Sequence, residues 1–324
     1  MTDRVIRLAF LGCGKIARAH AKRLRKHRAH VEVSFASRDA TRAAAFAKEL
    51  GGRSFGSYTE AIASPDIDAV AVVTPPASHT ELALAALAAG KHVVLEKPPA
   101  ATSQELGRIG EAAVAAGKQV FVAENYQYKP LLLKLRALLA EGVVGDVLFI
   151  QVNAIKKQPA THDWRDDPKL ALGGALYEGG IHWIDFMASL GLTVRGVRGL
   201  RPALPAGAAV ERSMLVSFDY AEGAVGTLAY SWEVPSTAKG LRLSKIYGRK
   251  GSITFETNGL WVLCHGTKTR LYIPGLRDLA GYNAMWADFV RAWTTDSPPK
   301  MTLAQARRDL ELVEQAYATA AEVS

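Results

Sequence analysis

The chain has few cysteines and no long hydrophobic run, and each absence narrows the class of protein. Its two cysteines, Cys13 and Cys264, are too few for a disulfide framework and lack the paired spacing of a metal site. No apolar run approaches the roughly 20 residues that span a bilayer. Residues 1–7 also lack the apolar stretch of a secretory signal. We therefore expect a cytoplasmic protein with reduced thiols, no bound metal and no membrane association.

An excess of charge of one sign is confined to the first 30 residues. They hold nine Lys or Arg and one Asp, whereas the rest of the chain has a balance of only +1. Lys15, Arg18, Lys22 and Arg25 recur at helical spacing, so a solvated helix face explains the excess. A polyanion-binding stripe would need interleaved aromatics or a known reader fold. Neither is present, and we predict no nucleic-acid partner.

The first 124 of the 324 residues alternate between strand and helix patterns. Short apolar runs predict strands at 5–11, 31–36, 68–73, 92–95 and 119–123. Helices are predicted between them, at 15–28, 39–50, 58–63, 78–89 and 103–116. Strands that alternate with helices form right-handed crossovers and a parallel sheet. Residues 1–124 are therefore predicted to form a doubly wound α/β domain.

The pattern changes after residue 124, where strands dominate. Seven strands are predicted between 194 and 273, joined by tight turns such as Asn258-Gly259. A further strand is expected at 146–155, with helices at 130–141, 180–190, 283–295 and 302–321. Residues 125–324 are therefore predicted to form an α+β domain with an antiparallel sheet.

The segment Gly12-Cys13-Gly14-Lys15-Ile16-Ala17 joins the first strand to the first helix. Gly12 permits a tight turn, Gly14 lets the backbone approach a pyrophosphate, and Ala17 lets the helix pack on the sheet. The free amides of the helix end would then face the phosphates. The spacing predicts dinucleotide binding, with Gly12, Gly14, Lys15 and Ile16 at the cofactor. Cys13 is interpreted as a packing residue rather than a nucleophile.

The end of the second strand favours NADP over NAD. NAD-dependent proteins usually place Asp or Glu there to bind the ribose hydroxyls. Here Ser37 occupies that place and Arg38 follows it, a hydroxyl and a guanidinium that suit a 2′-phosphate. Asp39 complicates this reading, although helix capping explains it well. NADP is the predicted cofactor, and NAD remains possible.

Two further segments carry side chains suited to proton transfer. Glu96-Lys97-Pro98 ends a predicted parallel strand, so Lys97 would face the ligand crevice, although it could also be an ordinary surface lysine. In the second domain a helix from about 178 would align Glu178, His182 and Asp185 on one face. A desolvated lysine and such a series of carboxylates and an imidazole can both move a proton. A structural, hydrogen-bonded histidine is the alternative for His182.

These segments together resemble the glucose–fructose oxidoreductase, inositol dehydrogenase and MocA-like (Gfo/Idh/MocA) family. The resemblance also rests on Thr74-Pro75-Pro76-Ala77-Ser78-His79 and on residues 89–98 and 173–185, and extends over nearly the whole chain. It implies a Rossmann domain, an open-faced antiparallel sheet, and NAD(P)-dependent redox chemistry on a sugar or cyclitol carbon. It also implies a homo-oligomer, a dimer or a tetramer, formed through the open sheet.

The resemblance assigns roles to particular residues. Lys97 matches the family's catalytic lysine and His182 its catalytic histidine, whereas Glu178 stands where the family commonly has Asp. Positions that resemble cofactor contacts are Thr74, Pro75, His79, Glu96, Lys97, Asn125, Trp164 and Arg165. Positions that could line the substrate pocket are Lys97, Tyr126, His162, Glu178 and His182.

The predicted function is therefore hydride transfer between a nicotinamide and a hydroxyl- or keto-bearing carbon of a sugar-like compound. The cofactor carries the hydride, and the protein aligns the two carbons and manages the proton. Two alternatives stay open: an enzyme that uses the nicotinamide transiently for glycoside cleavage or elimination, and a non-catalytic regulator that binds NADP or a sugar.

Overall fold

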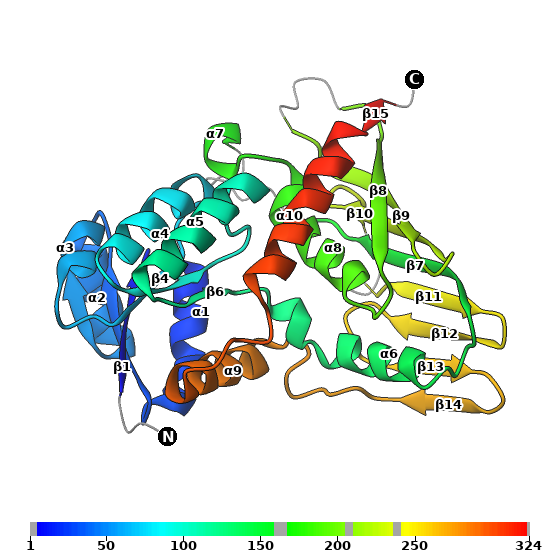
Figure 1. The fold of residues 1–324 in the computed structure, drawn as a ribbon, viewed down its shortest axis with the longest axis horizontal. Coiled ribbons are helices and arrows are strands. Elements are labelled where there is room, and N and C mark those ends of the chain that lie inside the picture. The colour runs from blue at the N-terminus through cyan, green and yellow to red at the C-terminus, as the bar shows by residue number, and fades with distance from the viewer. Residues whose placement is uncertain (1–4, 159–166, 205–209, 236–240, 323–324) are drawn as a thin grey trace. The chain divides into compact units, whose positions relative to one another are not determined.

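A computed structural model describes residues 5–158, 167–204, 210–235 and 241–322 (Figure 1). The chain forms two compact units, Met1–Glu124 with Tyr282–Arg307, and Asn125–Gly281 with Arg308–Ser324. Residues 282–307 were predicted to lie in the second domain. These residues belong to the first unit instead, because Phe289 and Trp293 each pack with their ring centroids 5.0 Å from that of Phe121.

The first unit is built on six parallel strands in the order β3-β2-β1-β4-β5-β6. Their bounds are β1 Ile6–Leu11, β2 Val31–Ala36, β3 Arg53–Phe55, β4 Ala69–Val72, β5 His92–Leu95 and β6 Val120–Val122. The central strands are apolar almost throughout because both faces of the sheet are covered; Leu8, Val70 and Val93, for example, are fully buried. This confirms the predicted doubly wound domain.

Helices connect these strands, and short polar side chains mark where several of them begin. Asp39 caps α2, Ser57 caps α3 and Thr102 caps α5, each by accepting from a backbone amide of the first turn. The helix bounds are α1 Lys15–Leu24, α2 Ala40–Leu50, α3 Tyr58–Ala63, α4 His79–Ala88, α5 Ser103–Ala116 and α9 Tyr282–Thr295. Figure 1 shows α9 beside α1, although 257 residues separate the end of one from the start of the other in sequence.

The second unit contains a nine-stranded sheet in the order β14-β13-β12-β11-β7-β10-β9-β8-β15. The strands are β7 Val147–Ile155, β8 Val194–Arg201, β9 Ser213–Tyr220, β10 Val225–Ser231, β11 Leu243–Gly248, β12 Gly251–Glu256, β13 Val262–His265, β14 Thr269–Tyr272 and β15 Ala321–Glu322. Most neighbours are antiparallel, as predicted. The pairs β7–β10 and β8–β15 are parallel instead, because long connections bring each partner back in the same direction.

One face of this sheet is covered and the other is open. Along β9 the buried residues Met214, Val216, Phe218 and Tyr220 alternate with more exposed ones. The helices of this unit are α6 Pro130–Ala140, α7 Pro168–Ala171 and α8 Ile181–Ala188, and α10 Leu303–Ala318 begins in the first unit and ends in the second. The hydroxyl of Tyr220 donates to the carbonyl of Met187, which ties α8 to the sheet.

Candidate functional site

Four segments leave the sheet of the first unit at one edge. In the strand register Leu11 lies beside both Ala36 and Val72, and Val72 lies beside Leu95. The residues that follow these strand ends include the predicted cofactor and proton-transfer positions, at 12–17, 37–42, 73–79 and 96–98. The carboxyl edge of a doubly wound sheet is where such folds bind ligands. The structure therefore places these candidates of the first unit along one edge.

The glycine turn after β1 has the geometry that a bound pyrophosphate needs. Gly12 has a φ of +119°, and a side chain there would bring its Cβ within 3.0 Å of the carbonyl oxygen of Val73. Gly14 precedes α1 with no cap from any described side chain, and a Cβ there would meet nothing within 4 Å. Lys15 is exposed and Ile16 half-buried in the first turn. The start of α1 is thus uncapped beside an open Gly14, which fits the phosphates of a dinucleotide.

Cys13 lies inside this turn without the character of a nucleophile. Its side chain is buried and its Sγ lies 3.6 Å from the carbonyl oxygen of Ala36. Burial raises the pKa of the Cys13 thiol to about 11, so the group stays protonated near neutral pH.

Two arginines flank the end of β2. Arg38 and Arg42 are both exposed, and both lie near the phenol of Tyr58, where they oppose the rise in its pKa that burial causes. Ser37 is buried, and its hydroxyl accepts from the amide of Asp39. Arg42 was not predicted from the sequence. Its spacing of four residues from Arg38, at the start of a helix, was the signal that could have found it.

Asp39 is committed to α2. Its Oδ1 accepts from the amides of Thr41 and Arg42 and from the Thr41 hydroxyl, at 3.0, 3.3 and 2.5 Å. These bonds lower the pKa of Asp39. The carboxylate that complicated the prediction of NADP is thus engaged as a helix cap.

His79 lies behind the edge rather than on it. Its ring is buried, with Nδ1 at 2.8 Å from the carbonyl oxygen of Pro98 and Nε2 at 2.9 Å from that of Thr74. Thr74 is half-buried, and its hydroxyl accepts from Ser78. Both ring nitrogens of His79 therefore support neighbouring loops, which favours a positioning role over direct contact with a cofactor. Pro75 is half-buried at the same strand end.

Lys97 follows β5 and is half-buried, and the Lys97–Pro98 peptide is cis. Glu96 beside it is buried. One oxygen of Glu96 accepts from the Lys97 amide at 3.0 Å, and the other lies 2.6 Å from Nε2 of His20. Glu96 therefore supports the backbone of Lys97 and turns its carboxylate inward.

In the second unit His182 stacks on Tyr126. Their ring centroids are 4.5 Å apart with an interplanar angle of 13°, and both residues are half-buried. Lys129 is buried with its Nζ 4.5 Å from the centre of the Tyr126 ring, on the face of an aromatic that attracts cations. The structure thus brings together two of the predicted residues, His182 and Tyr126.

Glu178 lies in a π-helical turn, Leu176–Gly180, that leads into α8. The helix predicted at 180–190 is confirmed as α8, and Glu178 lies before its regular part. Asp185 is fully buried and its Oδ1 accepts from Gln127 at 2.9 Å, and the side chain of Arg308 lies 3.4 Å away. Asp185 is thus engaged in hydrogen bonds that hold α8 in place.

Tyr230 on β10 and Arg242 just before β11 join this cluster, and neither was predicted from the sequence. Tyr230 is buried, and its pKa is raised by burial and by the nearby charge of Glu178. Arg242 is buried with its guanidinium 6.0 Å from the Trp183 ring, and burial lowers its pKa. Both lie more than 50 residues beyond Glu178 in sequence, and no local spacing linked them to it. A polar residue on the covered face of a strand was the available signal.

Asn125 begins the second unit and is buried. Its amide nitrogen donates to the carbonyl of Ala280 at 2.6 Å, and its Oδ1 has no hydrogen-bond partner among the residues that the structure describes. A buried acceptor of this kind suits a ligand donor. The predicted positions His162, Trp164 and Arg165 lie outside the described residues.

At two glycines near Glu178, neighbouring atoms leave no room for a side chain. A Cβ on Gly174 would lie 1.6 Å from Oε2 of Glu211, and one on Gly179 would lie 2.3 Å from the Tyr230 hydroxyl. Glu211 is itself bound, because its Oε1 accepts from the Leu176 amide and the Tyr317 hydroxyl. The Gly-Gly pairs of this segment thus permit the close packing that holds the π-helical turn.

We therefore predict that Gly174→Ala destabilises the second unit. Overpacking costs about 1–3 kcal/mol of the free energy of unfolding, because the buried Glu211 must move. Urea unfolding followed by fluorescence measures the loss. Gly107→Ala is the control, since its Cβ would meet nothing closer than 3.7 Å within α5 and alanine favours helices. Equal stabilities of the two variants would contradict the prediction.

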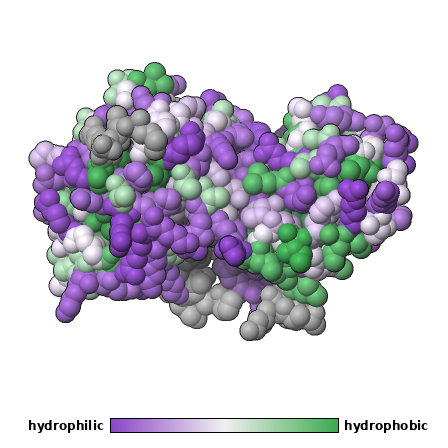
Figure 2. All heavy atoms as spheres, turned by 90° about the horizontal axis from the view of Figure 1, so that it is seen from below, coloured by the Kyte–Doolittle hydropathy of each residue, from purple (hydrophilic) through white to green (hydrophobic). Residues whose placement is uncertain are grey.

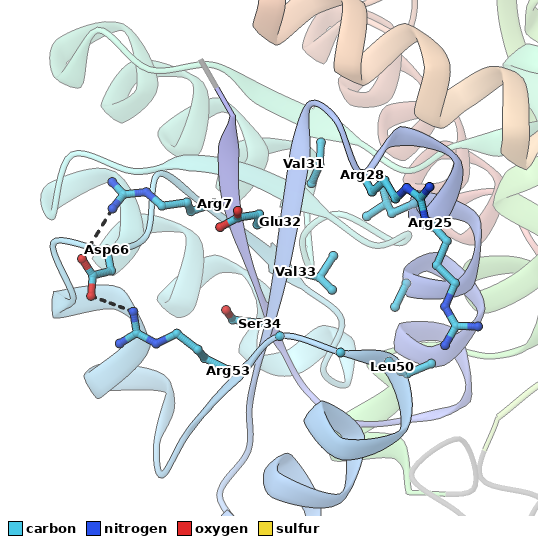
Figure 3. Close-up of a pocket in the computed structure, with 14 residues that line it drawn as sticks. Arg7, Arg25, Arg28, Val31, Glu32, Val33, Ser34, Leu50, Arg53 and Asp66 are labelled. Carbon is cyan, nitrogen blue, oxygen red and sulfur yellow. Dashed lines mark hydrogen bonds and ion pairs between the residues drawn. The ribbon is translucent and has the colours of Figure 1, made fainter. Parts of the chain in front are cut away.

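A cavity of about 530 Å³ lies at the opposite edge of the first sheet, near the starts of β1 and β2 (Figure 3). Arg7 and Arg53 point toward Asp66 from two sides, at 3.5 and 2.7 Å. Arg25 lies on the far side of β2 and donates to the Glu49 carbonyl. Much of the basic charge here is therefore paired within the unit, and the cavity is separate from the carboxyl edge.

Among the described residues, no group of three or more His, Cys, Asp and Glu is placed to hold a metal ion. Across the same part of the chain, the helices are all too short or too polar to span a bilayer.

The chain belongs to the Gfo/Idh/MocA oxidoreductase family, which confirms the resemblance seen in the sequence. Residues 6–124 match the family model for the NAD-binding Rossmann fold of these oxidoreductases, and residues 132–254 match the GFO/IDH/MocA C-terminal domain. The glycine turn and the uncapped helix α1 are consistent with that assignment.

Several relatives carry names of sugar dehydrogenases. The chain is 31% identical over 187 residues to glucose-6-phosphate 3-dehydrogenase of Bacillus subtilis, covering 56% of this chain and 52% of that protein. It is 26% identical over 297 residues, 90% of each chain, to D-xylose 1-dehydrogenase (NADP(+)) 2 of Haloferax volcanii. The chain spans about half the length of several of the curated relatives it matches.

Solved structures agree over nearly the whole chain. An oxidoreductase from Thermotoga maritima superposes with a TM-score of 0.87 at 26% identity, covering 98% of this chain and 97% of its own. The WlbA dehydrogenase from Chromobacterium violaceum, in complex with NADH and UDP-GlcNAcA, also has a TM-score of 0.87, at 25% identity with 99% and 95% coverage.

Proposed function

We propose that this chain is an NAD(P)-dependent oxidoreductase that transfers a hydride between the nicotinamide and a hydroxyl- or keto-bearing carbon of a sugar or cyclitol. The observation that carries the proposal is the shared carboxyl edge of the first sheet, where the glycine turn and Lys97 follow neighbouring strand ends. The family assignment and the printed names of the sugar dehydrogenases support the substrate class.

The proposal gives the proton to two side chains. When bound, the nicotinamide supplies the hydride chemistry, and the protein must hold a proton at the substrate oxygen. Lys97 on the first unit and His182 on the second are assigned to that work, because each is half-buried, Glu96 holds the Lys97 amide, and the His182 ring stacks on Tyr126. Glu178 is assigned to tuning His182. Tyr126 is assigned to the substrate pocket, and its stacking on the same imidazole supports that role.

NADP is the proposed cofactor, with NAD as the alternative. Arg38 and Arg42 offer two guanidinium groups at the end of β2, and Asp39 is engaged as a helix cap. A guanidinium binds phosphate oxygens in a planar, paired geometry. Among relatives, two D-xylose dehydrogenases are named for NADP(+), whereas solved structures contain NADH or NAD.

A substrate screen tests the proposal. Sugars, cyclitols and their keto forms are incubated with NADP(H) or NAD(H), and absorbance of the reduced nicotinamide is followed. Net cofactor turnover with a sugar-like compound supports the proposal. Product formation without net turnover would favour transient use of the nicotinamide. Tight binding of dinucleotide and sugar without any reaction would favour a regulator.

We also propose that the open face of the second sheet joins copies of the chain. Hydrophobic residues gather in patches on the surface that Figure 2 shows. Phe149 and Val225 are paired on adjacent strands and are 54% and 46% exposed, and Leu243 is 49% exposed. Exposed apolar patches of this kind are typical of protein–protein interfaces.

Phe149→Lys is therefore expected to weaken self-association. Loss of a buried aromatic at an interface is worth about 2 kcal/mol, so the dissociation constant should rise roughly thirtyfold. Sedimentation equilibrium measures this. Val114→Lys is the control, since Val114 is 83% exposed on α5 of the first unit. A wild-type protein that remains monomeric at micromolar concentrations would refute the interface.

A further inference from the structure

Glu96 is held by a chain of buried side chains within the first unit. Its Oε1 lies 2.6 Å from Nε2 of His20 on α1, and the indole nitrogen of Trp286 on α9 lies 2.9 Å from Nδ1 of the same histidine. His20 and Trp286 are each 1% exposed, and Glu96 is 7% exposed. This hydrogen-bonded series of side chains is therefore almost entirely buried, and it connects α9 to the end of β5.

The donors and acceptors of this chain can be assigned from chemistry alone. An indole N–H is only a donor, so Nδ1 of His20 must accept and carries no proton. The ring proton of His20 is then on Nε2, which donates to the Glu96 carboxylate. A doubly protonated His20 would set two N–H donors against each other at 2.9 Å. Trp286 thus selects one neutral tautomer of His20.

The hydrogen-bonded series of side chains ends at the backbone of Lys97. The second oxygen of Glu96 accepts from the Lys97 amide at 3.0 Å. On the other side of the same loop, the Pro98 carbonyl oxygen lies 2.8 Å from Nδ1 of His79. The orientation of Glu96 therefore bears directly on the peptide that carries Lys97, and the tautomer of His20 sets that orientation.

We propose that Trp286 and His20 are positioning residues that act through Glu96 to hold Lys97 in place for the reaction. The role in turnover rests on the proposed function, because it requires that Lys97 take part in the chemistry. The positions of the protons on His20 and its partners do not depend on the proposed function. A test can therefore separate the two.

The first arm is nitrogen NMR of the uniformly nitrogen-labelled protein, with no substrate needed. His20 should show a protonated Nε2 and an unprotonated Nδ1 near neutral pH, and the Lys97 amide proton should be shifted downfield and slow to exchange. In Trp286→Phe the donor to Nδ1 is lost, so Nδ1 can take up a second proton while Nε2 still donates to Glu96, and the Lys97 amide should exchange faster. A proton on Nδ1 of His20 in the unmutated protein would overturn the proposal.

The second arm compares two matched variants in α9. Trp286→Phe removes the donor to His20, whereas Trp293→Phe removes an indole N–H that has no hydrogen-bond partner among the described residues. Loss of one hydrogen bond is expected to lower turnover about three- to tenfold, with dinucleotide affinity unchanged by fluorescence titration. Trp293→Phe should leave turnover unaltered, with thermal melts confirming that both variants fold.

A conservative change at His20 completes the test. His20→Gln keeps a donor toward Glu96 and should retain more turnover than His20→Phe, which keeps none. Equal losses in both, or an equal loss in Trp286→Phe and Trp293→Phe, would overturn the positioning role. If the unmutated protein reduces or oxidises no compound of the screen, the proposed function fails, and the NMR arm still decides the hydrogen-bonded chain.

Discussion

Replacement of Lys97 or His182 by alanine should lower the rate of hydride transfer by about 10²- to 10⁴-fold, the usual worth of general acid–base catalysis. Neither change should weaken dinucleotide binding much, because the glycine turn and the arginines beyond β2 remain intact. The measurement is single-turnover hydride transfer with a substrate from the screen, followed by absorbance of the nicotinamide. Glu178→Gln should cost less, since the carboxylate is assigned to tuning the imidazole.

Lys91→Met is the matched control for Lys97. Lys91 is buried just before β5, where its ammonium donates to the carbonyls of Ser64 and Ile67 at the opposite edge of the sheet. Its loss should reduce stability while the rate of hydride transfer is retained. Lys97→Ala or His182→Ala enzymes that react at the unmutated rate would remove that residue from the mechanism. A parallel loss of cofactor affinity in Lys97→Ala would make Lys97 a nicotinamide-positioning group instead.

Arg38→Ala should weaken NADPH binding about tenfold to a hundredfold and leave NADH binding nearly unchanged. A charge-assisted contact to a phosphate is worth roughly 1.5–3 kcal/mol, and only NADP carries the 2′-phosphate. Arg42→Ala should act in the same direction, and the double variant should bind both dinucleotides with similar affinity. Fluorescence titration with NADPH and with NADH gives two dissociation constants for each protein.

The control for this experiment is Arg53→Ala. Arg53 pairs with Asp66 at the opposite edge of the sheet, so its removal changes the net charge equally without touching the proposed phosphate site. A loss of NADPH affinity in Arg53→Ala as large as in Arg38→Ala would point to a general field rather than a contact. Equal affinities for NADPH and NADH in the unmutated protein would contradict the proposed preference.

The sequence predicted the first unit better than the second because its signals are local. Buried parallel strands are continuous apolar runs, and Gly12 and Gly14 mark the turn that follows the first of them. The parallel pairing of β7 with β10 depends on how long connections return, which no short pattern records. The π-helical turn at Glu178 arises from contacts of Gly174 and Gly179 with Glu211 and Tyr230, which are distant in sequence.

The same contrast applies to the candidate site. Lys97 and His182 stand in recognisable local motifs, and the structure shows each of them supported by neighbours within its own unit. Arg42, Tyr230 and Arg242 were missed because their relevance depends on the fold. His20 lies in the predicted basic helix and was not singled out, although its buried ring faces Glu96. Charge patterns along a helix describe its exposed side and say little about a polar residue on the other.

Because α9 belongs to the first unit, that unit can be completed only after residues 125–281 have been synthesised. During synthesis residues 1–124 emerge first, yet the helix that covers Phe121 and supplies Trp286 is made only after all of 125–281. A fragment cut at residue 124 would therefore expose an apolar face and leave His20 without its indole donor. To produce the first unit alone, residue 124 would have to be joined by a short linker to residue 282. The shortened protein would then end at residue 307. In this sense residues 125–281 of the second unit are an insertion within the first.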